Sequence, residues 1–145
     1  MEIDRVSAEV VDSAVRIHRE LDPGLLESVY ERLLAASLER AGLKVDRQKP
    51  IEIAFEGMRF PDAFRVDLIV SDVPIVEIKS AAQVAPVHAK QLLTYLRLMK
   101  LPVGLLLNFG QYTMKEGIRR VVNGYSVPAN LSASPRLRVK SEYGE

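Results

Sequence analysis

The strongest constraint on the fold is a strand–helix–strand pattern in the second half of the chain. Two short apolar runs, at residues 75–79 and 101–108, flank a segment that begins at Pro86 and has helical character up to about Met99. Proline suits the first turn of a helix, because its missing N–H would have no partner there. Two strands joined by such a helix form a crossover connection. The pattern therefore predicts a mixed sheet flanked by helices.

The segments before this crossover also show clear periodicities. The apolar residues near the N-terminus recur at a helical spacing, and those after Gly42 alternate at a period of two. Ser7 is the predicted N-cap of the first helix, and Gly42 ends the second. The predicted elements are two helices, over residues 7–21 and 25–41, and two strands, over residues 51–55 and 64–70. The complete predicted order is helix, helix, three strands, helix, strand.

Length and composition restrict the class of protein. A chain of 145 residues suits one domain, which we place at residues 1–125. Residues 126–145 mix Pro, Ser, Asn and Arg, and we expect a tail that is partly ordered at best. No apolar run is long enough to cross a bilayer, and no apolar core follows the first residues, so we expect a cytoplasmic protein that does not contact a membrane.

Several kinds of chemistry are excluded by the residues that the chain lacks. It contains no cysteine, which excludes disulfides, cysteine–zinc modules and a thiol nucleophile. Its two histidines cannot form a three-histidine zinc site. The formal net charge is +1, so nucleic-acid binding would depend on a local basic patch. No P-loop, G-x-S-x-G elbow or dinucleotide fingerprint is present.

Three charged residues interrupt the apolar strands and are the leading catalytic candidates. Glu77 and Lys79 lie two residues apart, so both side chains leave the same face of one strand. Asp67 lies between Val66 and Leu68 in the preceding strand. The alternative interpretation is that Glu77 and Lys79 form a solvated strand end. In that case Asp67 would be salt-bridged to Arg65 or Lys79.

The length of the hairpin loop decides whether the two acids can meet. A three-residue loop over residues 71–73 would place Asp67 opposite Glu77, with Cβ atoms about 5 Å apart. A two-residue loop would put the acids on opposite faces. Two carboxylates about 4 Å apart repel by about 4 kcal/mol at an effective dielectric constant near 20. A bound cation, a shared proton or Lys79 must therefore compensate this repulsion.

Magnesium, or manganese in its place, is the cation that fits such a pair. Mg²⁺ prefers oxygen ligands and keeps several waters, so two carboxylates suffice to hold it. Such an ion acidifies a bound water and offsets the charge of a phosphodiester under attack. Lys79 would orient that water or stabilise the developing negative charge. The residues therefore predict metal-assisted phosphodiester hydrolysis.

Two helices offer further candidates. His88, Gln91 and Tyr95 share one face of the predicted third helix, where Gln91 could donate to a phosphate and Tyr95 could stack on a base. Glu27, Tyr30 and Glu31 lie on one side of the second helix. Glu27 could join the metal shell as a further carboxylate. Ordinary polar helix faces are the alternative interpretation of both groups.

Five short segments, taken together, resemble a known family. Residues 24–30 read G-x-x-E-x-x-Y, with Gly24, Glu27 and Tyr30 at the named positions. The other segments, in chain order, are residues 65–68, 76–79, 91–96 and 104–110. This set is similar to the GxxExxY family of the PD-(D/E)XK nuclease-like superfamily, over roughly residues 5–125. The resemblance implies a restriction-endonuclease-like α-β-β-β-α-β core.

The resemblance also implies a magnesium nuclease site, with nucleic acid as substrate and DNA favoured over RNA. It implies that Asp67, Glu77 and the backbone carbonyl of Ile78 hold the metal, with Glu27 as a further acid. Lys79 would stabilise the water or the charge, and Gln91 would be the polar residue of the following helix. The remaining candidates, as substrate contacts, are Tyr30, His88 and Tyr95.

Some alternatives remain open at the level of sequence. Asp62 follows Pro61 and spells the "PD" of the superfamily name, but we expect it in a turn and favour Asp67. The chain could instead be an inactive nucleic-acid-binding or protein-interaction module that has kept the fold. A domain of this size has little surface with which to clamp a duplex, so a homodimer is a further hypothesis.

Overall fold

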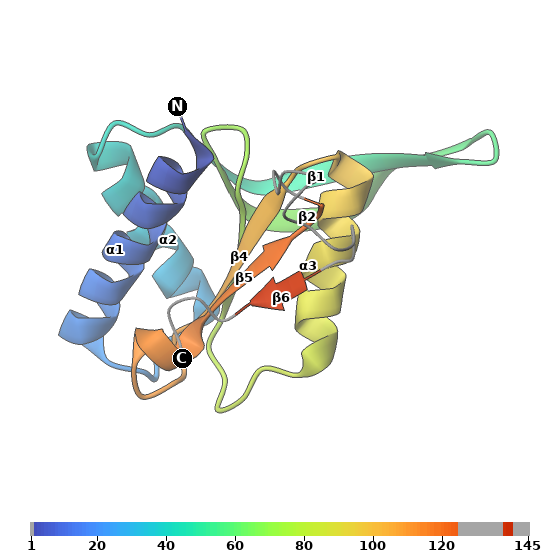
Figure 1. Cartoon of the computed structure of the whole chain (residues 1–145). Coiled ribbons are helices and arrows are strands. Elements are labelled where there is room, and N and C mark those ends of the chain that lie inside the picture. Colours follow the sequence, from blue (N-terminus) through green and yellow to red (C-terminus); the bar gives the residue numbers. More distant parts are fainter. Residues whose placement is uncertain (1, 125–137, 141–145) are drawn as a thin grey trace, which may run out of the picture.

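The computed structural model describes residues 2–124 and 138–140 (Figure 1). Within these ranges the chain forms four helices and six strands. In chain order, they are α1 (Ile3–Leu21), α2 (Glu27–Arg40), β1 (Val45–Phe55), β2 (Met58–Val70), β3 (Ile75–Lys79), α3 (Pro86–Met99), β4 (Val103–Asn108), α4 (Met114–Gly117), β5 (Ile118–Val122) and β6 (Arg138–Lys140).

The strands form one sheet in the order β1-β2-β3-β4-β5-β6. Strands β3 and β4 run parallel, and the other neighbouring pairs are antiparallel. Helix α3 makes the crossover between the two parallel strands. The predicted mixed sheet and the predicted α-β-β-β-α-β order are therefore confirmed.

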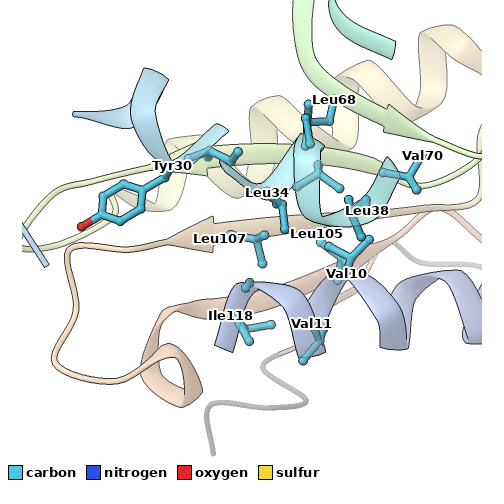
Figure 2. Close-up of a cluster of buried hydrophobic side chains, with 14 of the residues drawn as sticks. Val10, Val11, Tyr30, Leu34, Leu38, Leu68, Val70, Leu105, Leu107 and Ile118 are labelled. Atoms are coloured by element: carbon cyan, nitrogen blue, oxygen red, sulfur yellow. The ribbon is translucent and has the colours of Figure 1, made fainter. Parts of the chain in front are cut away.

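Helices cover both faces of the sheet (Figure 1). Helices α1 and α2 pack on one face, where buried side chains from both helices meet those of β2, β3, β4 and β5 (Figure 2). Helix α3 packs on the other face through Ala89, Leu92, Leu93 and Leu96. The two apolar layers explain why β4, which lies between them, is buried along its whole length.

Helix α1 begins earlier than predicted. Its N-cap is Glu2, and Ser7 lies inside the helix with only 4% of its surface exposed. The prediction that Ser7 caps the helix is therefore wrong. Because Val6 is already buried, the helix must begin before it to bring this side chain into the core.

Strands β1 and β2 are much longer than predicted and form an arm that projects beyond the rest of the molecule (Figure 1). Asp62 lies within β2, so the prediction that it occupies a turn is wrong. Its carboxylate pairs with Arg65 at 3.1 Å, and both side chains are exposed. Residues 47–50 of β1 and 58–63 of β2, which the predicted strands left out, are exposed, so they lack the buried apolar face that identifies a half-buried strand.

The region after β4 contains elements that the sequence did not predict. Helix α4 has only four residues, and β5 carries two arginines among its five residues. Strand β6 pairs with β5, within the segment that we expected to be a tail. Residues 126–137 and 141–145 of that tail lie outside the described residues, as does residue 125. None of the described helices is both long and apolar enough to span a membrane.

Candidate active site

The β2–β3 hairpin places the two predicted acids opposite each other. Its loop is closed by a hydrogen bond from the Val70 N–H to the Pro74 carbonyl, 3.1 Å long, which leaves residues 71–73 between them. The recorded backbone pairs are Leu68 with Val76 and Ile69 with Ile75. Continuing this register puts Asp67 opposite Glu77, as the odd loop length predicted.

The carboxylates bind backbone groups at the point where the two strands diverge. The Asp67 N–H donates to Oε2 of Glu77 over 2.9 Å, and the Ile78 N–H donates to Oδ2 of Asp67 over 2.8 Å. The recorded backbone pairing of β2 with β3 does not extend to these residues. Each side chain therefore supplies an acceptor to the opposite strand, and both carboxylates lie in the same gap.

Burial makes this pair of acids costly to ionise. Glu77 is 8% exposed, and burial raises the pKa of its carboxyl from 4.5 to about 8, with the charge of Asp67 as the next cause. The hydrogen bond from Asp67 and the charge of Lys79 lower this pKa in part. Without a bound cation, Glu77 is therefore mainly protonated at neutral pH, which removes the repulsion between the two acids.

These contacts contradict the alternative interpretation of the acids. A solvated strand end would leave Glu77 exposed, but it is buried. Arg65, one of the basic residues considered as a partner of Asp67, pairs with Asp62 instead.

Lys79 and Ile78 complete the end of β3. Lys79 is half-buried, and no hydrogen bond or ion pair of its ammonium group is recorded within residues 2–124 and 138–140. In a strand, the N–H and C=O of one residue point toward the same neighbouring strand. Because the Ile78 N–H points at Asp67, the Ile78 carbonyl also faces β2 and the gap with the acids. This orientation suits the predicted ligand, whose binding to a metal stays a prediction.

A polar network that the sequence did not predict connects Asp67 to helix α2. Nε2 of Gln48 donates to Oε1 of Glu31 over 2.7 Å and to Oδ1 of Asp67 over 3.1 Å. Glu31 is buried and also pairs with Arg47 at 3.2 Å. Gln48 adopts a left-handed backbone conformation, with φ of 50°. Such a backbone conformation is unusual for a residue other than glycine and is common at functional sites.

The structure distinguishes Glu31 from the predicted acid Glu27. Glu27 is the first residue of α2 and is exposed, and no contact with Asp67 or Glu77 is recorded for it. The negative charge of Glu31, by contrast, contributes to raising the Glu77 pKa. Helix α2 therefore brings Glu31 to the acids, and the role of Glu27 stays a prediction.

Among the candidates on α3, Tyr95 is the residue whose pKa is affected by the charges of Glu77 and Asp67. Its ring stacks on Phe64 of β2 at 4.1 Å between centroids. Burial, followed by the charges of Glu77 and Asp67, raises the pKa of its hydroxyl. Gln91 is exposed, and His88 is half-buried with a buried Nδ1 atom that has no recorded partner among the described residues.

Tyr30 has a structural position instead of the predicted substrate contact. It is fully buried and stacks on Phe109 with ring centroids 4.4 Å apart. Its hydroxyl donates to the Asp22 carbonyl over 2.6 Å and accepts from the Leu25 N–H over 3.2 Å. A buried ring cannot contact a substrate, so this prediction is wrong. Tyr30 anchors the loop that leads into α2.

The loop after Lys79 is held by Asn108, the last residue of β4, whose role could not be predicted from the sequence. Oδ1 of Asn108 accepts from the N–H groups of Ala81 and Gly110, both over 3.0 Å, and Nδ2 donates to the Ala81 carbonyl over 3.0 Å. A Cβ atom at Gly110 would lie 2.2 Å from the Ala81 oxygen, so only glycine fits there. The segment at residues 104–110 thus fixes the end of β3.

The candidate metal ligands are the carboxylate oxygens of Asp67 on β2 and of Glu77 on β3. Over residues 2–124 and 138–140, no group of three or more His, Cys, Asp or Glu side chains is arranged to hold a metal ion. The gap therefore offers a pair of carboxylates, and Oε1 of Glu77 has no hydrogen bond recorded in the described part of the chain.

Comparison with known proteins gives one match. The family model described as the PD-(D/E)XK nuclease superfamily matches residues 4–121, which include Asp67, Glu77 and Lys79. No curated protein and no solved structure matches the chain.

Proposed function

Because the chain belongs to the PD-(D/E)XK nuclease superfamily, we propose that it is a Mg²⁺-dependent nuclease that hydrolyses phosphodiester bonds of DNA. The mixed sheet with helices on both faces is consistent with a restriction-endonuclease-like fold. The observation that carries the proposal is the convergence of Asp67 and Glu77 in one gap, with Lys79 at the end of the same strand.

We also assign the chain to the GxxExxY family within that superfamily. The assignment is supported by the spacing of Gly24, Glu27 and Tyr30 and by the order of the four later segments. Two residues of these segments stabilise loops in this protein. Tyr30 anchors the loop before α2, and Asn108 holds the loop after β3.

The acids suit a magnesium ion, with manganese as a substitute. Mg²⁺ is commonly held by one or two carboxylates together with waters and substrate phosphate. Asp67, Glu77 and the Ile78 carbonyl would hold it, with Glu27 as a further acid. When bound, such an ion supplies an acidified water and a positive charge beside the phosphate. It would also replace the proton that burial otherwise keeps on Glu77.

The other residues of the site would bind and orient the substrate. The Lys79 ammonium would donate to the attacking water or to a phosphate oxygen as negative charge develops there. Gln91, exposed on α3, would donate to a phosphate, and His88 and Tyr95 would contact the neighbouring nucleotide. Gln48 would keep Asp67 in position through its bridge to Glu31.

A cleavage screen tests the proposal. The full chain is incubated with single- and double-stranded DNA and with RNA, in Mg²⁺ or Mn²⁺. Asp67→Ala and Lys79→Ala should each abolish cleavage while the far-ultraviolet circular dichroism spectrum remains native. Asp62→Ala is the matched control, because it removes an exposed carboxylate from the same strand and should leave cleavage unchanged.

Two results would overturn the proposal. Cleavage by both site variants at the parent rate would exclude these residues from the reaction. Binding of nucleic acid by the parent without any cleavage would favour the inactive module. The cytoplasmic location and the homodimer stay predictions of the sequence.

A further inference from the structure

A small polar pocket lies beside the candidate active site. It has a volume of about 210 Å³, and its polar lining includes Gln83, Asn108, Gln111, Glu116 and Arg119. None of these residues belongs to the site proposed above. The pocket lies between the loop that enters α3 and the strands β4 and β5.

The register of the sheet puts this pocket on the same face as Glu77. Glu77 pairs with Leu106 of β4, and Leu106 pairs with Arg119 of β5. Side chains of directly paired residues project to the same face of a sheet. Because neighbouring strands are about 4.8 Å apart, the Cα atoms of Glu77 and Arg119 are separated by about 10 Å.

The pocket and the end of β3 share their supports. Asn108 lines the pocket, and its side chain holds Ala81, two residues after Lys79. Gln111 also lines the pocket, and its Nε2 donates to the Ala82 carbonyl over 2.9 Å. The short loop at residues 80–83 therefore connects the end of β3, which carries Glu77 and Lys79, to the lining of the pocket.

The described lining of the pocket contains one basic and one acidic side chain, and Arg119 is the one free to bind an anionic ligand. Arg119 is exposed, and no hydrogen bond or ion pair of its guanidinium is recorded for the described residues. The acid Glu116 is occupied in part by the Thr113 hydroxyl, which donates to it over 3.3 Å. Arg120 alternates to the opposite face and pairs with Asp4 at 3.2 Å. Arginine is well suited to phosphate, because its planar guanidinium can donate two parallel hydrogen bonds.

The size of the pocket indicates which kind of phosphate it takes. Pockets that enclose a whole small molecule commonly measure about 300–1,000 Å³. A pocket of about 210 Å³ is smaller and suits a single group of an extended polymer. Its separation from Glu77 is comparable to one or two nucleotide steps along a strand.

We propose that the pocket around Arg119 binds a backbone phosphate of the same nucleic-acid strand that is cleaved, one or two nucleotides from the scissile bond. The inference rests on the proposed function and extends it, because it gives the site a polymeric substrate and a direction across the sheet. Arg119 is a binding residue in this proposal, and Gln83 and Gln111 provide amide groups at the rim.

Binding measurements test the proposal without depending on turnover. A fluorescein-labelled single-stranded oligodeoxynucleotide is titrated with full-length protein carrying Asp67→Ala, and anisotropy is followed at several salt concentrations. Adding Arg119→Gln should weaken binding about three- to tenfold and reduce the slope of log K against log salt by about 0.7, the value expected for one lost phosphate contact. Lys115→Gln is the matched control, because it removes one exposed positive charge only four residues away. It should change neither quantity.

Cleavage of modified substrates locates the contacted phosphate. Single phosphates near the scissile bond are replaced in turn by uncharged methylphosphonates. At one position, the methylphosphonate should slow cleavage by the parent about as much as Arg119→Gln slows cleavage of the unmodified strand. Cleavage by Arg119→Gln should not be slowed further by the methylphosphonate at that position. Thermal unfolding of each variant confirms that the fold is intact.

The outcomes separate this inference from the proposed function. If the parent cleaves DNA but Arg119→Gln binds and cuts like the parent, the pocket is not a phosphate site and the inference alone fails. Equal weakening by Lys115→Gln would show a general charge effect and would also overturn it. If the parent neither binds nor cleaves nucleic acid, the proposed function fails and the inference fails with it.

Discussion

Replacing Glu77 by glutamine should stabilise the metal-free protein at alkaline pH. The buried carboxyl of Glu77 lies beside Asp67, and its pKa is raised from 4.5 to about 8. An acid whose pKa is raised by folding stabilises the folded state below the lower value, and this stabilisation is lost as the pH rises through the higher one. Glu77→Gln keeps an oxygen that can accept from the Asp67 N–H but cannot ionise.

The size of the effect follows from the two pKa values. Each pH unit between them corresponds to about 1.4 kcal/mol, so the difference amounts to about 5 kcal/mol above pH 8. Such a value is a large fraction of the 5–15 kcal/mol that typically holds a domain together. Below pH 4.5, where both side chains are neutral, the parent and the variant should be equally stable.

Urea unfolding in the presence of EDTA, followed by circular dichroism at pH 4, 6 and 9, measures this difference. With a slope near 2 kcal/mol per molar urea, the midpoint of the variant at pH 9 should lie roughly 2–3 M above that of the parent. Asp62→Asn, a change of an exposed acid in β2, is the control and should shift the midpoint little at any pH. A gap between Glu77→Gln and the parent that is independent of pH, or a parent that is the more stable at pH 9, would refute the reasoning.

Three further predictions concern the metal and the supports of the site. Millimolar Mg²⁺ at pH 8 should raise the melting temperature of the parent, and its removal with EDTA should reverse the change; Asp67→Ala should not respond, because one carboxylate of the pair is missing. Asn108→Ala should lower the free energy of unfolding by about 2–4 kcal/mol in urea titrations, since it leaves backbone groups of Ala81 and Gly110 unpaired. An unchanged midpoint would show that water replaces the amide. Tyr30→Phe should cost about 1–2 kcal/mol, measured in the same way, because the stacking is kept and two hydrogen bonds are lost; an unchanged stability would show that the hydroxyl does not anchor the loop before α2.

The elements that could be predicted from the sequence are those with strong local signals. The bounds of β3 and α3 match their predictions, because charged or proline residues mark their ends. The pairing of Asp67 with Glu77 could be predicted from the parity of the loop, since a shift of one residue reverses every side chain in a strand. In both cases, residues close together in the sequence were sufficient for the prediction.

The length of the β1–β2 arm could not be predicted. Residues 47–50 of β1 and 58–63 of β2 are exposed, so no buried apolar face distinguishes them from a loop. The placement of Asp62 in a turn was wrong for this reason. The early start of α1 was missed differently, because Ser7 has the chemistry of a cap but lies within the helix and is buried there.

The roles of the polar residues that support the site could not be predicted either. Gln48 of β1 donates to Glu31 of α2 and to Asp67 of β2, and no periodicity in the sequence reveals such contacts between separate elements. Asn108 acts on a segment 27 positions earlier in the chain. A glutamine or asparagine has no characteristic spacing, so these roles become visible only when the tertiary structure brings the segments together.

The two hydrogen bonds in which a carboxylate accepts from a backbone N–H of the opposite strand make the site observable by nuclear magnetic resonance. The amide protons of Asp67 and Ile78 are bonded to carboxylate oxygens, whereas those of the neighbouring ladder are bonded to carbonyls. A ligand that draws the carboxylates toward itself weakens these two bonds, so deuterium uptake at both amides should accelerate while the rest of the hairpin stays protected. Occupancy of the gap can thus be followed in the resting protein, before any bond is cut.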